Sequence, residues 1–221
     1  MLYLVGIGLC NEKNLTLEAI NAIKNCDEVF LENYTSVLQC KKEDLEKIIG
    51  KKINFADRNL VESNTLVQKA KEKNIALLII GDVFSATTHI SLFIEAKKQN
   101  VEIRVINNAS ILTAIGITGL ELYKFGRITS IPFHETDYPI KVLKENQQLG
   151  LHTLFLLDLN PENNRFLTIA EACDYLIRKG ISPKTKALGC ARIGCPDYKI
   201  VYADLNELKS IDFGKPPYCL I

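Results

Sequence analysis

The segment GDVFSATTH at residues 81–89 has the residue types of a ligand-binding loop. It follows the apolar run 75–80 and precedes an amphipathic stretch, so Asp82 is expected at the carboxyl end of a strand. In open α/β sheets, ligands bind beyond the carboxyl ends of the strands. The hydroxyl groups after Asp82 lead into an expected helix start, where free backbone N–H groups favour an anion. The structural alternative is that Thr87 or Thr88 only caps the helix.

Two further segments have the same setting. Asn107-Asn108-Ala109-Ser110-Ile111 follows an expected strand and opens an expected helix, of which Ser110 is a candidate N-cap. Gly6-Ile7-Gly8-Leu9 follows the first expected strand, and its glycines allow a tight turn and the close approach of a ligand. Asn11 replaces the third glycine of the dinucleotide pattern, which disfavours NAD. The repeated arrangement indicates one crevice lined by several strand ends.

Other kinds of site have less support in the sequence. It contains neither a G-x-S-x-G nucleophile elbow nor a G-x-x-x-x-G-K-[ST] phosphate loop. The seven cysteines are never spaced as C-x-x-C and the three histidines are dispersed, so no metal is expected. The segment ENYTS at residues 32–36 brings polar and aromatic groups to another strand end, with a simple turn as the alternative.

Alternating strand and helix patterns connect these segments. Continuous Ile, Leu and Val runs suit strands buried on both faces, and strand–helix alternation predicts an α/β fold with a mostly parallel sheet flanked by helices. The expected strands cover residues 2–5, 28–31, 53–56, 75–80, 101–106 and 128–132. The expected helices cover residues 16–25, 42–49, 63–73, 89–99 and 110–116.

The pattern changes after residue 133, which predicts two domains. The first covers residues 1–133, a connecting segment with a short helix at 140–149 covers 134–150, and the second covers 151–221. Turn residues between the later apolar runs favour antiparallel connections, so the second domain is expected to be α+β with a mixed sheet. Its expected elements are strands at 153–157, 187–192, 199–202 and 218–221 and a helix at 168–179.

The composition is that of a globular protein without an obvious nucleic-acid or membrane partner. The chain has 221 residues, 47% hydrophobic and 24% charged, and a net charge of only +1, whereas nucleic-acid binders usually carry a basic excess. No apolar run reaches the roughly 18 residues that cross a bilayer. Most cysteines lie among apolar neighbours, where a thiol behaves as a small hydrophobe, and a cytoplasmic location is expected.

Eight segments together resemble the diphthine synthases, a family in the tetrapyrrole-methylase-like class of S-adenosylmethionine-dependent methyltransferases. They occur in the family's order and span nearly the whole chain. The segments are LYLVGIGL (2–9), ENYTS (32–36), GDVFSATTH (81–89), NASI (108–111), GITGLELYKFG (116–126), GLHTLFLLDL (150–159), ARIG (191–194) and DFGKPPYCLI (212–221).

The resemblance implies a homodimer that methylates a protein. The implied substrate is the 2-(3-amino-3-carboxypropyl)histidine of translation elongation factor 2, which is methylated successively on its amino group to give diphthine, the precursor of diphthamide. Val83 stands where the family usually has Pro, Tyr218 where a His is common, and the chain ends soon after PPYCLI, so a shortened edge of the second domain is expected. The resemblance implies a cofactor between the two domains, in contact with Leu9, Asp82, Ser85, Ser110, Ile111, Leu157, Ile193 and Tyr218.

The sequence does not identify a catalytic residue. A sulfonium methyl donor carries its own leaving group, so neither a metal nor a covalent intermediate is required and no obligatory base is expected. Tyr34 and His89 are candidates for relaying a proton, and Glu32 and Tyr34 for surrounding a trimethylammonium product. Two alternatives stay open: a methylase acting on a precorrin or porphyrin, and a non-catalytic regulatory module that binds an adenine-containing ligand.

Overall fold

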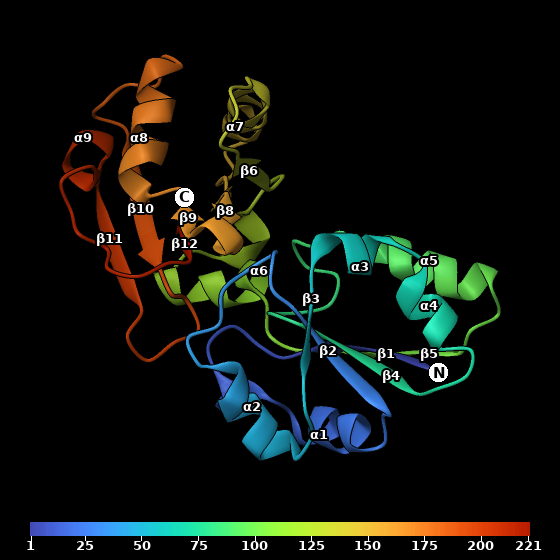
Figure 1. Ribbon diagram of the computed structural model, residues 1–221. Coiled ribbons are helices and arrows are strands. Elements are labelled where there is room, and N and C mark those ends of the chain that lie inside the picture. The colour runs from blue at the N-terminus through green and yellow to red at the C-terminus, as the bar shows by residue number, and fades with distance from the viewer. The chain divides into compact units, whose positions relative to one another are not determined.

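The chain folds into two compact units, each built on a five-stranded sheet. The computed structural model describes residues 1–221. The units comprise Met1–Ala114 and Ile115–Ile221, and their elements are labelled in Figure 1.

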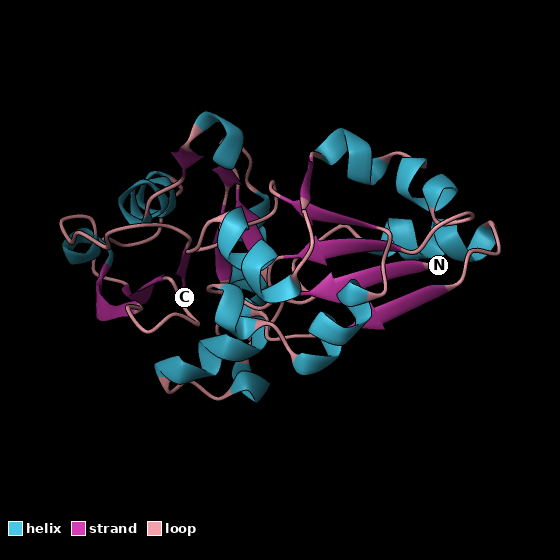
Figure 2. Cartoon of the chain, turned by 60° about the horizontal axis from the view of Figure 1, so that its bottom comes forward, coloured by secondary structure: helices cyan, strands magenta, loops and turns pink.

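The sheet of the first unit is parallel throughout, as predicted. Its strand order is β3-β2-β4-β1-β5, and every neighbouring pair is parallel. All residues of β4 are buried, which explains why its sequence is continuously apolar rather than alternating. Figure 2 shows these strands side by side. The strands are β1 (Leu2–Gly6), β2 (Glu28–Glu32), β3 (Asn54–Ala56), β4 (Ile75–Ile79) and β5 (Ile103–Ile106).

Helices cover both faces of this sheet (Figure 1). The helices α1 (Leu17–Lys24) and α2 (Lys42–Ile49) pack on one face, where Ile23 and Leu45 are fully buried. The opposite face is covered by α3 (Arg58–Glu62), α4 (Thr65–Lys69) and α5 (Ile90–Lys98). A short helix, α6 (Ile111–Ala114), follows β5. The flanked sheet of an α/β fold is therefore confirmed.

The helix predicted at residues 63–73 is shorter than expected, because α4 covers only Thr65–Lys69, and the separate helix α3 precedes it. The carboxylate of Asp57 accepts a hydrogen bond from the Leu60 N–H at 2.8 Å and starts α3 early. Ser63 then adopts an extended conformation with φ −82° and ψ 166°, which ends α3 before α4 begins. Asp and Ser favour such caps over helix interiors because their side chains bond to nearby backbone groups.

The second unit contains the expected mixed sheet. Its strand order is β11-β10-β12-β7-β6, in which only the β6–β7 pair is parallel. A small hairpin of β8 (Leu159–Asn160) and β9 (Arg165–Phe166) was not predicted. The sheet strands are β6 (Thr129–Ile131), β7 (Phe155–Leu157), β10 (Lys186–Ala191), β11 (Lys199–Asp204) and β12 (Tyr218–Leu220).

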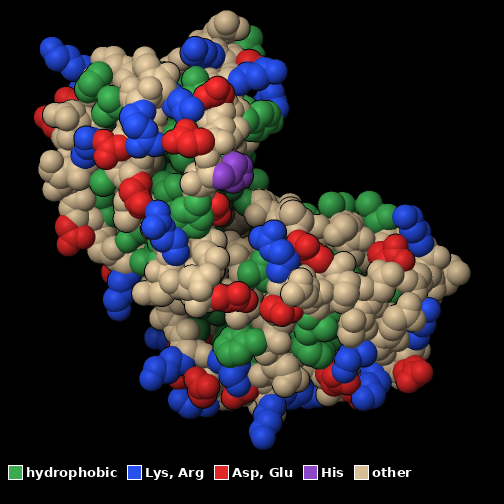
Figure 3. Space-filling model, turned by 45° about the horizontal axis from the view of Figure 1, so that its top comes forward, with side chains coloured by type: hydrophobic (Ala, Val, Ile, Leu, Met, Phe, Trp, Pro, Cys, Tyr) green, Lys and Arg blue, Asp and Glu red, His purple; other side chains and the backbone are tan.

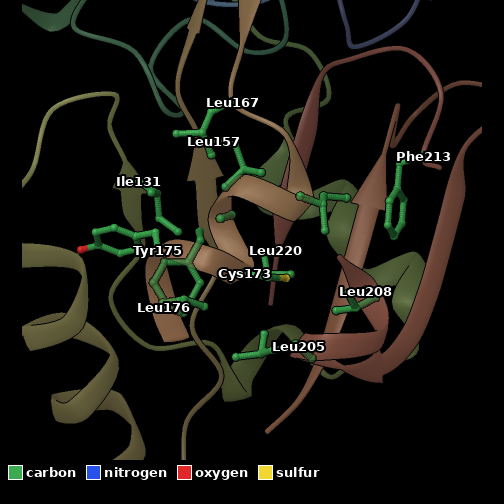
Figure 4. Close-up of a cluster of buried hydrophobic side chains, with 14 of the residues drawn as sticks. Ile131, Leu157, Leu167, Cys173, Tyr175, Leu176, Leu205, Leu208, Phe213 and Leu220 are labelled. Atoms are coloured by element: carbon green, nitrogen blue, oxygen red, sulfur yellow. The ribbon is translucent and has the colours of Figure 1, made fainter. Parts of the chain in front are cut away.

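The core of the second unit lies between this sheet and α8 (Ile169–Arg178). A reciprocal cap starts α8: Thr168 Oγ1 accepts from the Glu171 N–H, while the Glu171 carboxylate accepts from the Thr168 N–H at 2.8 Å. Figure 4 shows Leu176 and Cys173 directed into the apolar cluster, whereas the Tyr175 hydroxyl points away from it. That hydroxyl donates to the Thr136 carbonyl at 2.8 Å. The unit also contains α7 (Tyr138–Gln148) and α9 (Leu205–Leu208).

The predicted domain limits at 1–133, 134–150 and 151–221 differ from the compact units. The strand β6, expected to close the first domain, pairs with β7 in the sheet of the second unit. The expected connecting segment mostly forms α7, whose Ile140 and Val142 are buried. The division between Ala114 and Ile115 lies earlier than predicted because strand pairing, and not local polarity, assigns residues 115–150 to the second unit.

Charges are mixed on the surface. Figure 3 shows basic and acidic side chains interspersed on the visible face, in keeping with the net charge of +1. None of the helices is both long enough and apolar enough to span a bilayer.

Candidate functional site

Asp82 accepts hydrogen bonds from donors on two loops of the first unit. Its Oδ1 accepts from the Ser85 hydroxyl at 3.0 Å and from the Phe84 N–H at 3.2 Å. Its Oδ2 accepts from the Asn107 side chain at 2.9 Å and from the Asn108 N–H at 3.2 Å. A carboxylate has about four lone-pair sites, so all of them are occupied. The carboxylate thereby joins the loops that follow β4 and β5.

These contacts keep Asp82 ionised. Burial alone would raise the pKa of Asp82, but the donors from Asn107, Asn108, Phe84 and Ser85 outweigh it and hold the pKa below its ordinary value. No lysine or arginine is among the groups that act on this pKa. The carboxyl end of the parallel sheet therefore carries a negative charge that is hydrogen-bonded but not neutralised, an arrangement that suits a cationic ligand.

Asn108 connects the loop after β5 to the loop after β1. Its amide donates to the Gly6 carbonyl at 3.1 Å and to the Asn14 carbonyl at 3.0 Å. The Asn14 side chain in turn accepts from the Cys10 N–H at 2.9 Å. Together with Asp82, these bonds fix three loops against each other.

Glycine is required where these loops meet. A Cβ at Gly6 would lie 2.8 Å from the Gly81 carbonyl oxygen, closer than real Cβ atoms approach. Gly8 and Gly81 exchange two backbone hydrogen bonds and both have positive φ, +78° and +84°. The place of a Cβ on Gly81 is bordered by Leu9 Cδ2 at 3.6 Å and by the Ala109 carbonyl oxygen at 3.8 Å. A side chain at Gly81 would therefore occupy the space beside Leu9.

The five candidate residues of the first unit lie at the carboxyl end of its sheet. Leu9 borders Gly81, and Ser85 donates to Asp82. Ser110 is buried and accepts from the Leu112 N–H at 3.1 Å, as predicted for a helix start, and Ile111 begins α6.

The threonines do not cap α5. Its N-cap is His89, which makes no capping bond, and the Thr87 hydroxyl donates to the Val83 carbonyl at 2.6 Å.

The three candidate residues of the second unit also lie together, at one end of the strands of their sheet. Tyr218 pairs with Ala191 of β10, and the register of β12 with β7 places it level with Leu157. Ile193 follows the end of β10 and is buried. The Tyr218 hydroxyl donates to the Gly214 carbonyl, so it is already used within its own loop.

Arg192 positions the loops at this end of the second unit's sheet. Its guanidinium donates to the Asp197 carboxylate at 2.8 Å and to the carbonyls of Phe213 and Lys215 at 2.9 and 2.5 Å. The residue is buried and has φ +52°, unusual for a residue with a side chain. This conformation turns the chain directly before Ile193.

The candidate proton-relay residues lie together beside Glu32, the last residue of β2. Burial raises the pKa of Glu32 to about 7, although a hydrogen bond from the Thr35 hydroxyl opposes this shift. Burial lowers the pKa of His89 to about 4 and raises that of Tyr34. His89 Nε2 lies 3.7 Å from Glu32 Oε2, and the His89 and Tyr34 ring centroids are 6.4 Å apart.

Sequence reasoning named Asn108 and Arg192 only as members of motifs and did not mention Asn14. The signal for Asn108 was present, since it lies next to Ser110 at a strand end. Asn14 gave no signal because a polar residue after a glycine turn is ordinary.

Comparisons with known proteins place this chain in a family. The model of the family described as Tetrapyrrole (Corrin/Porphyrin) Methylases matches residues 1–209. A diphthine synthase of Methanocaldococcus jannaschii is 43% identical over 237 aligned residues, which cover 100% of this chain and 92% of the relative. A diphthine methyl ester synthase of Aspergillus fumigatus is 39% identical, with 100% of this chain and 87% of the relative covered.

A solved structure gives the same result. A crystal structure of diphthine synthase superposes with a TM-score of 0.94 and 37% identity, over 99% of this chain and 88% of the other. The chain belongs to the tetrapyrrole methylase family and, within it, to the diphthine synthases.

Proposed function

We propose that the protein is an S-adenosylmethionine-dependent methyltransferase that methylates the amino group of 2-(3-amino-3-carboxypropyl)histidine on translation elongation factor 2, giving diphthine. The observation that carries this proposal is the ionised Asp82 at the carboxyl end of the parallel sheet, in a chain that aligns over its full length with diphthine synthases. The cofactor supplies a methyl group on a positively charged sulfur, which leaves as a neutral thioether.

The residues present suit that cofactor. Leu9 and Ile111 would offer apolar contacts beside Gly81, where only Leu9 Cδ2 and the Ala109 carbonyl come within 4 Å of the place of a Cβ. Asp82 attracts the cationic ligand through its charge, because its oxygens already hold four donors. Ser85 and Ser110 would add hydroxyl contacts, and in the second unit Leu157, Ile193 and Tyr218 would contribute mainly apolar surface.

The chain's own residues contribute mainly binding and orientation. Positioning two reactants can lower a barrier by roughly 7–11 kcal/mol. The hydrogen bonds that fix the loops at Asp82, Asn108 and Arg192 supply the rigidity that positioning requires. Burial of the substrate amine would also lower its pKa and ease its deprotonation, because burial disfavours charge.

The direct test is methyl transfer to purified elongation factor 2 carrying the aminocarboxypropyl histidine. Labelled methyl on the factor, counted after acid precipitation, supports the proposal. The name of the matching family favours a tetrapyrrole substrate as the second candidate, so a precorrin or porphyrin is assayed in parallel. Cofactor binding by calorimetry without transfer to either substrate would instead indicate a regulatory module.

The assembly and location follow from the same proposal. We expect a homodimer, which light scattering coupled to size exclusion would detect, and a cytoplasmic protein, because elongation factor 2 acts there.

A further inference from the structure

A second polar cluster, separate from the Asp82 contacts, lies in the first unit and consists of Glu32, Asn33, Tyr34 and His89. Within it, Glu32 Oε2, Asn33 Oδ1, the Tyr34 hydroxyl and both ring nitrogens of His89 are buried and have no hydrogen-bond partner in the protein. They are all of the buried side-chain atoms in the chain with this property. Because native proteins satisfy most buried polar atoms, their gathering at one place marks a site for a polar ligand.

The cluster is assembled by two segments far apart in the sequence. Glu32 ends β2, and Leu31 pairs with Leu78 of β4, so Glu32 lies level with Ile79. His89 closes the loop that begins at Gly81 after β4. Glu32 and His89 are essentially inaccessible, at 0% and 1% exposure, Tyr34 reaches 8%, and Asn33 is half-buried and lies nearest to solvent.

The chemistry of the cluster matches an ammonium group. Glu32 Oε2, when ionised, and Asn33 Oδ1 only accept hydrogen bonds. A neutral His89 offers one donor and one acceptor, and the Tyr34 hydroxyl can do either. Acceptors therefore outnumber obligatory donors, and a primary ammonium, with three N–H groups and a positive charge, complements them.

Glu32 and Asp82 are carboxyls at the ends of adjacent strands with opposite environments. Four donors lower the pKa of Asp82, whereas burial raises the pKa of Glu32 to about 7. Pairs of carboxyls whose pKa values are driven apart mark a division of roles, one staying ionised and the other exchanging a proton. A base with a pKa near the working pH is the most effective proton acceptor.

We propose that the Glu32 cluster binds the amino group of the substrate and that Glu32 is the general base that deprotonates it. This inference rests on the proposed function. In the step, the N–H bond of the ammonium breaks, an O–H bond forms on the Glu32 carboxylate, and the electron pair stays on nitrogen for attack on the methyl donor. Glu32, whose pKa lies near neutrality, then releases the proton to solvent, so that it is ready for the next methylation.

The side of the cluster nearest to solvent is formed by Asn33 and Tyr34. The Arg58 guanidinium of α3 lies 5.2 Å from the centroid of the Tyr34 ring, and its side chain is 66% exposed. The exposed Arg58 therefore covers Tyr34 on its solvent side. The charged or titratable groups that face the cluster are Arg58 and Glu62 of α3 and its N-cap Asp57, in addition to Tyr34 and His89.

The decisive variant is Glu32→Gln, which keeps the shape and removes the proton acceptor. We expect kcat for methyl transfer to elongation factor 2 to fall about 100-fold or more, the usual range for loss of a general base. The dissociation constant for S-adenosylmethionine is expected to stay unchanged. In the wild type, kcat/KM should rise with pH as Glu32 of the free enzyme ionises through its pKa of about 7, and Glu32→Gln should lack this rise. Glu32→Asp should restore part of the rate.

The matched control is Glu28→Gln on the same strand. Glu28 lies at the opposite end of β2 and pairs with Lys69 and Lys73 at 2.6 and 3.0 Å. This variant should keep the wild-type kcat and pH profile.

The outcomes separate the inference from the function on which it rests. If the wild type labels elongation factor 2 and Glu32→Gln is equally fast at every pH, the role of Glu32 is overturned and the proposed function stands. If the wild type labels no elongation factor 2, the proposed function fails and the amine assignment with it. Should Glu32→Gln not fold, His89→Gln and Tyr34→Phe are tested, and an unchanged KM and kcat in both would overturn the cluster as the amine site.

Discussion

Replacing Glu32 by glutamine should stabilise the protein at alkaline pH much more than at acidic pH. The Glu32 side chain is fully buried, and burial raises its pKa from 4.5 to about 7. A carboxyl with a higher pKa in the folded than in the unfolded state contributes stability while it is protonated. That contribution is complete below the unfolded value and is lost as the pH rises through about 7. Glutamine does not ionise and avoids the loss.

The two pKa values set the magnitude. At about 1.4 kcal/mol for each pKa unit, the change from 4.5 to about 7 corresponds to roughly 3 kcal/mol. Most of it develops between about pH 5 and about pH 8. The free energy of unfolding of Glu32→Gln, relative to wild type, should therefore increase by roughly 2–3 kcal/mol over this interval.

His89 acts in the opposite direction but cancels in the comparison. Burial lowers its pKa from 6.5 to about 4, so neutral His89 contributes stability that is present above 6.5 and is lost as the pH falls towards 4. Both proteins contain His89, and the difference between them isolates Glu32.

The assay is denaturant unfolding followed by circular dichroism at the two pH values, for wild type, Glu32→Gln and Glu28→Gln. Hydrogen bonds from Lys69 and Lys73 lower the pKa of Glu28, so it is ionised at both pH values and its replacement should change stability equally at both. An equal change for Glu32→Gln at the two pH values would refute the reasoning, since Glu32 would then titrate as an ordinary carboxyl and would not exchange a proton near neutrality.

Three other substitutions test the loops. Asp82→Asn places an amide N–H₂ group opposite groups that donate hydrogen bonds to the carboxylate. It should lower the free energy of unfolding by about 1–3 kcal/mol and weaken S-adenosylmethionine binding in calorimetry. An unchanged affinity would reject the role of Asp82 in binding the cofactor. Ser110→Ala should cost about 1 kcal/mol through the lost cap; a raised cofactor dissociation constant with little change in Tm would show that the hydroxyl also contacts the ligand. Arg192→Lys cannot reproduce the bonds to Asp197, Phe213 and Lys215 and should lose about 3 kcal/mol or more, measured by thermal unfolding, where an unchanged Tm would contradict it.

The elements of the first unit could be predicted because their signals are local. The run Ile75–Ile79 is buried along its whole length, so its composition alone indicates a central strand. The hairpin of β8 and β9 could not be predicted in this way, because two-residue strands are too short to show a period. The assignment of β6 depends on its pairing with Phe155–Leu157, a long-range contact that the local sequence does not express.

The candidate site was predictable in position more than in chemistry. Asp82 and Ser110 each follow a strand, so the sequence places both at the carboxyl end of the sheet. In the structure, Asn107 and Asn108 donate hydrogen bonds to Asp82 and connect the two loops. The environment of Glu32 was not predictable, because ENYTS reads as a polar turn. Its burial follows from β2 lying between β3 and β4 and from His89 approaching from a distant loop.

The hydrogen bonds that join the loops after β1, β4 and β5 restrict how this fold can diverge. Asn108 bonds to Gly6 and Asn14, and its own N–H bonds to Asp82. An insertion in any one loop would therefore displace the other two. The connections at the amino end of the strands, at residues 50–53 and 99–102, make no hydrogen bond to these three loops, and we expect them to tolerate changes in length better. A new specificity at the carboxyl end of the sheet is thus expected to evolve by exchange of side chains on a fixed backbone, and not by lengthening of the loops after β1, β4 and β5.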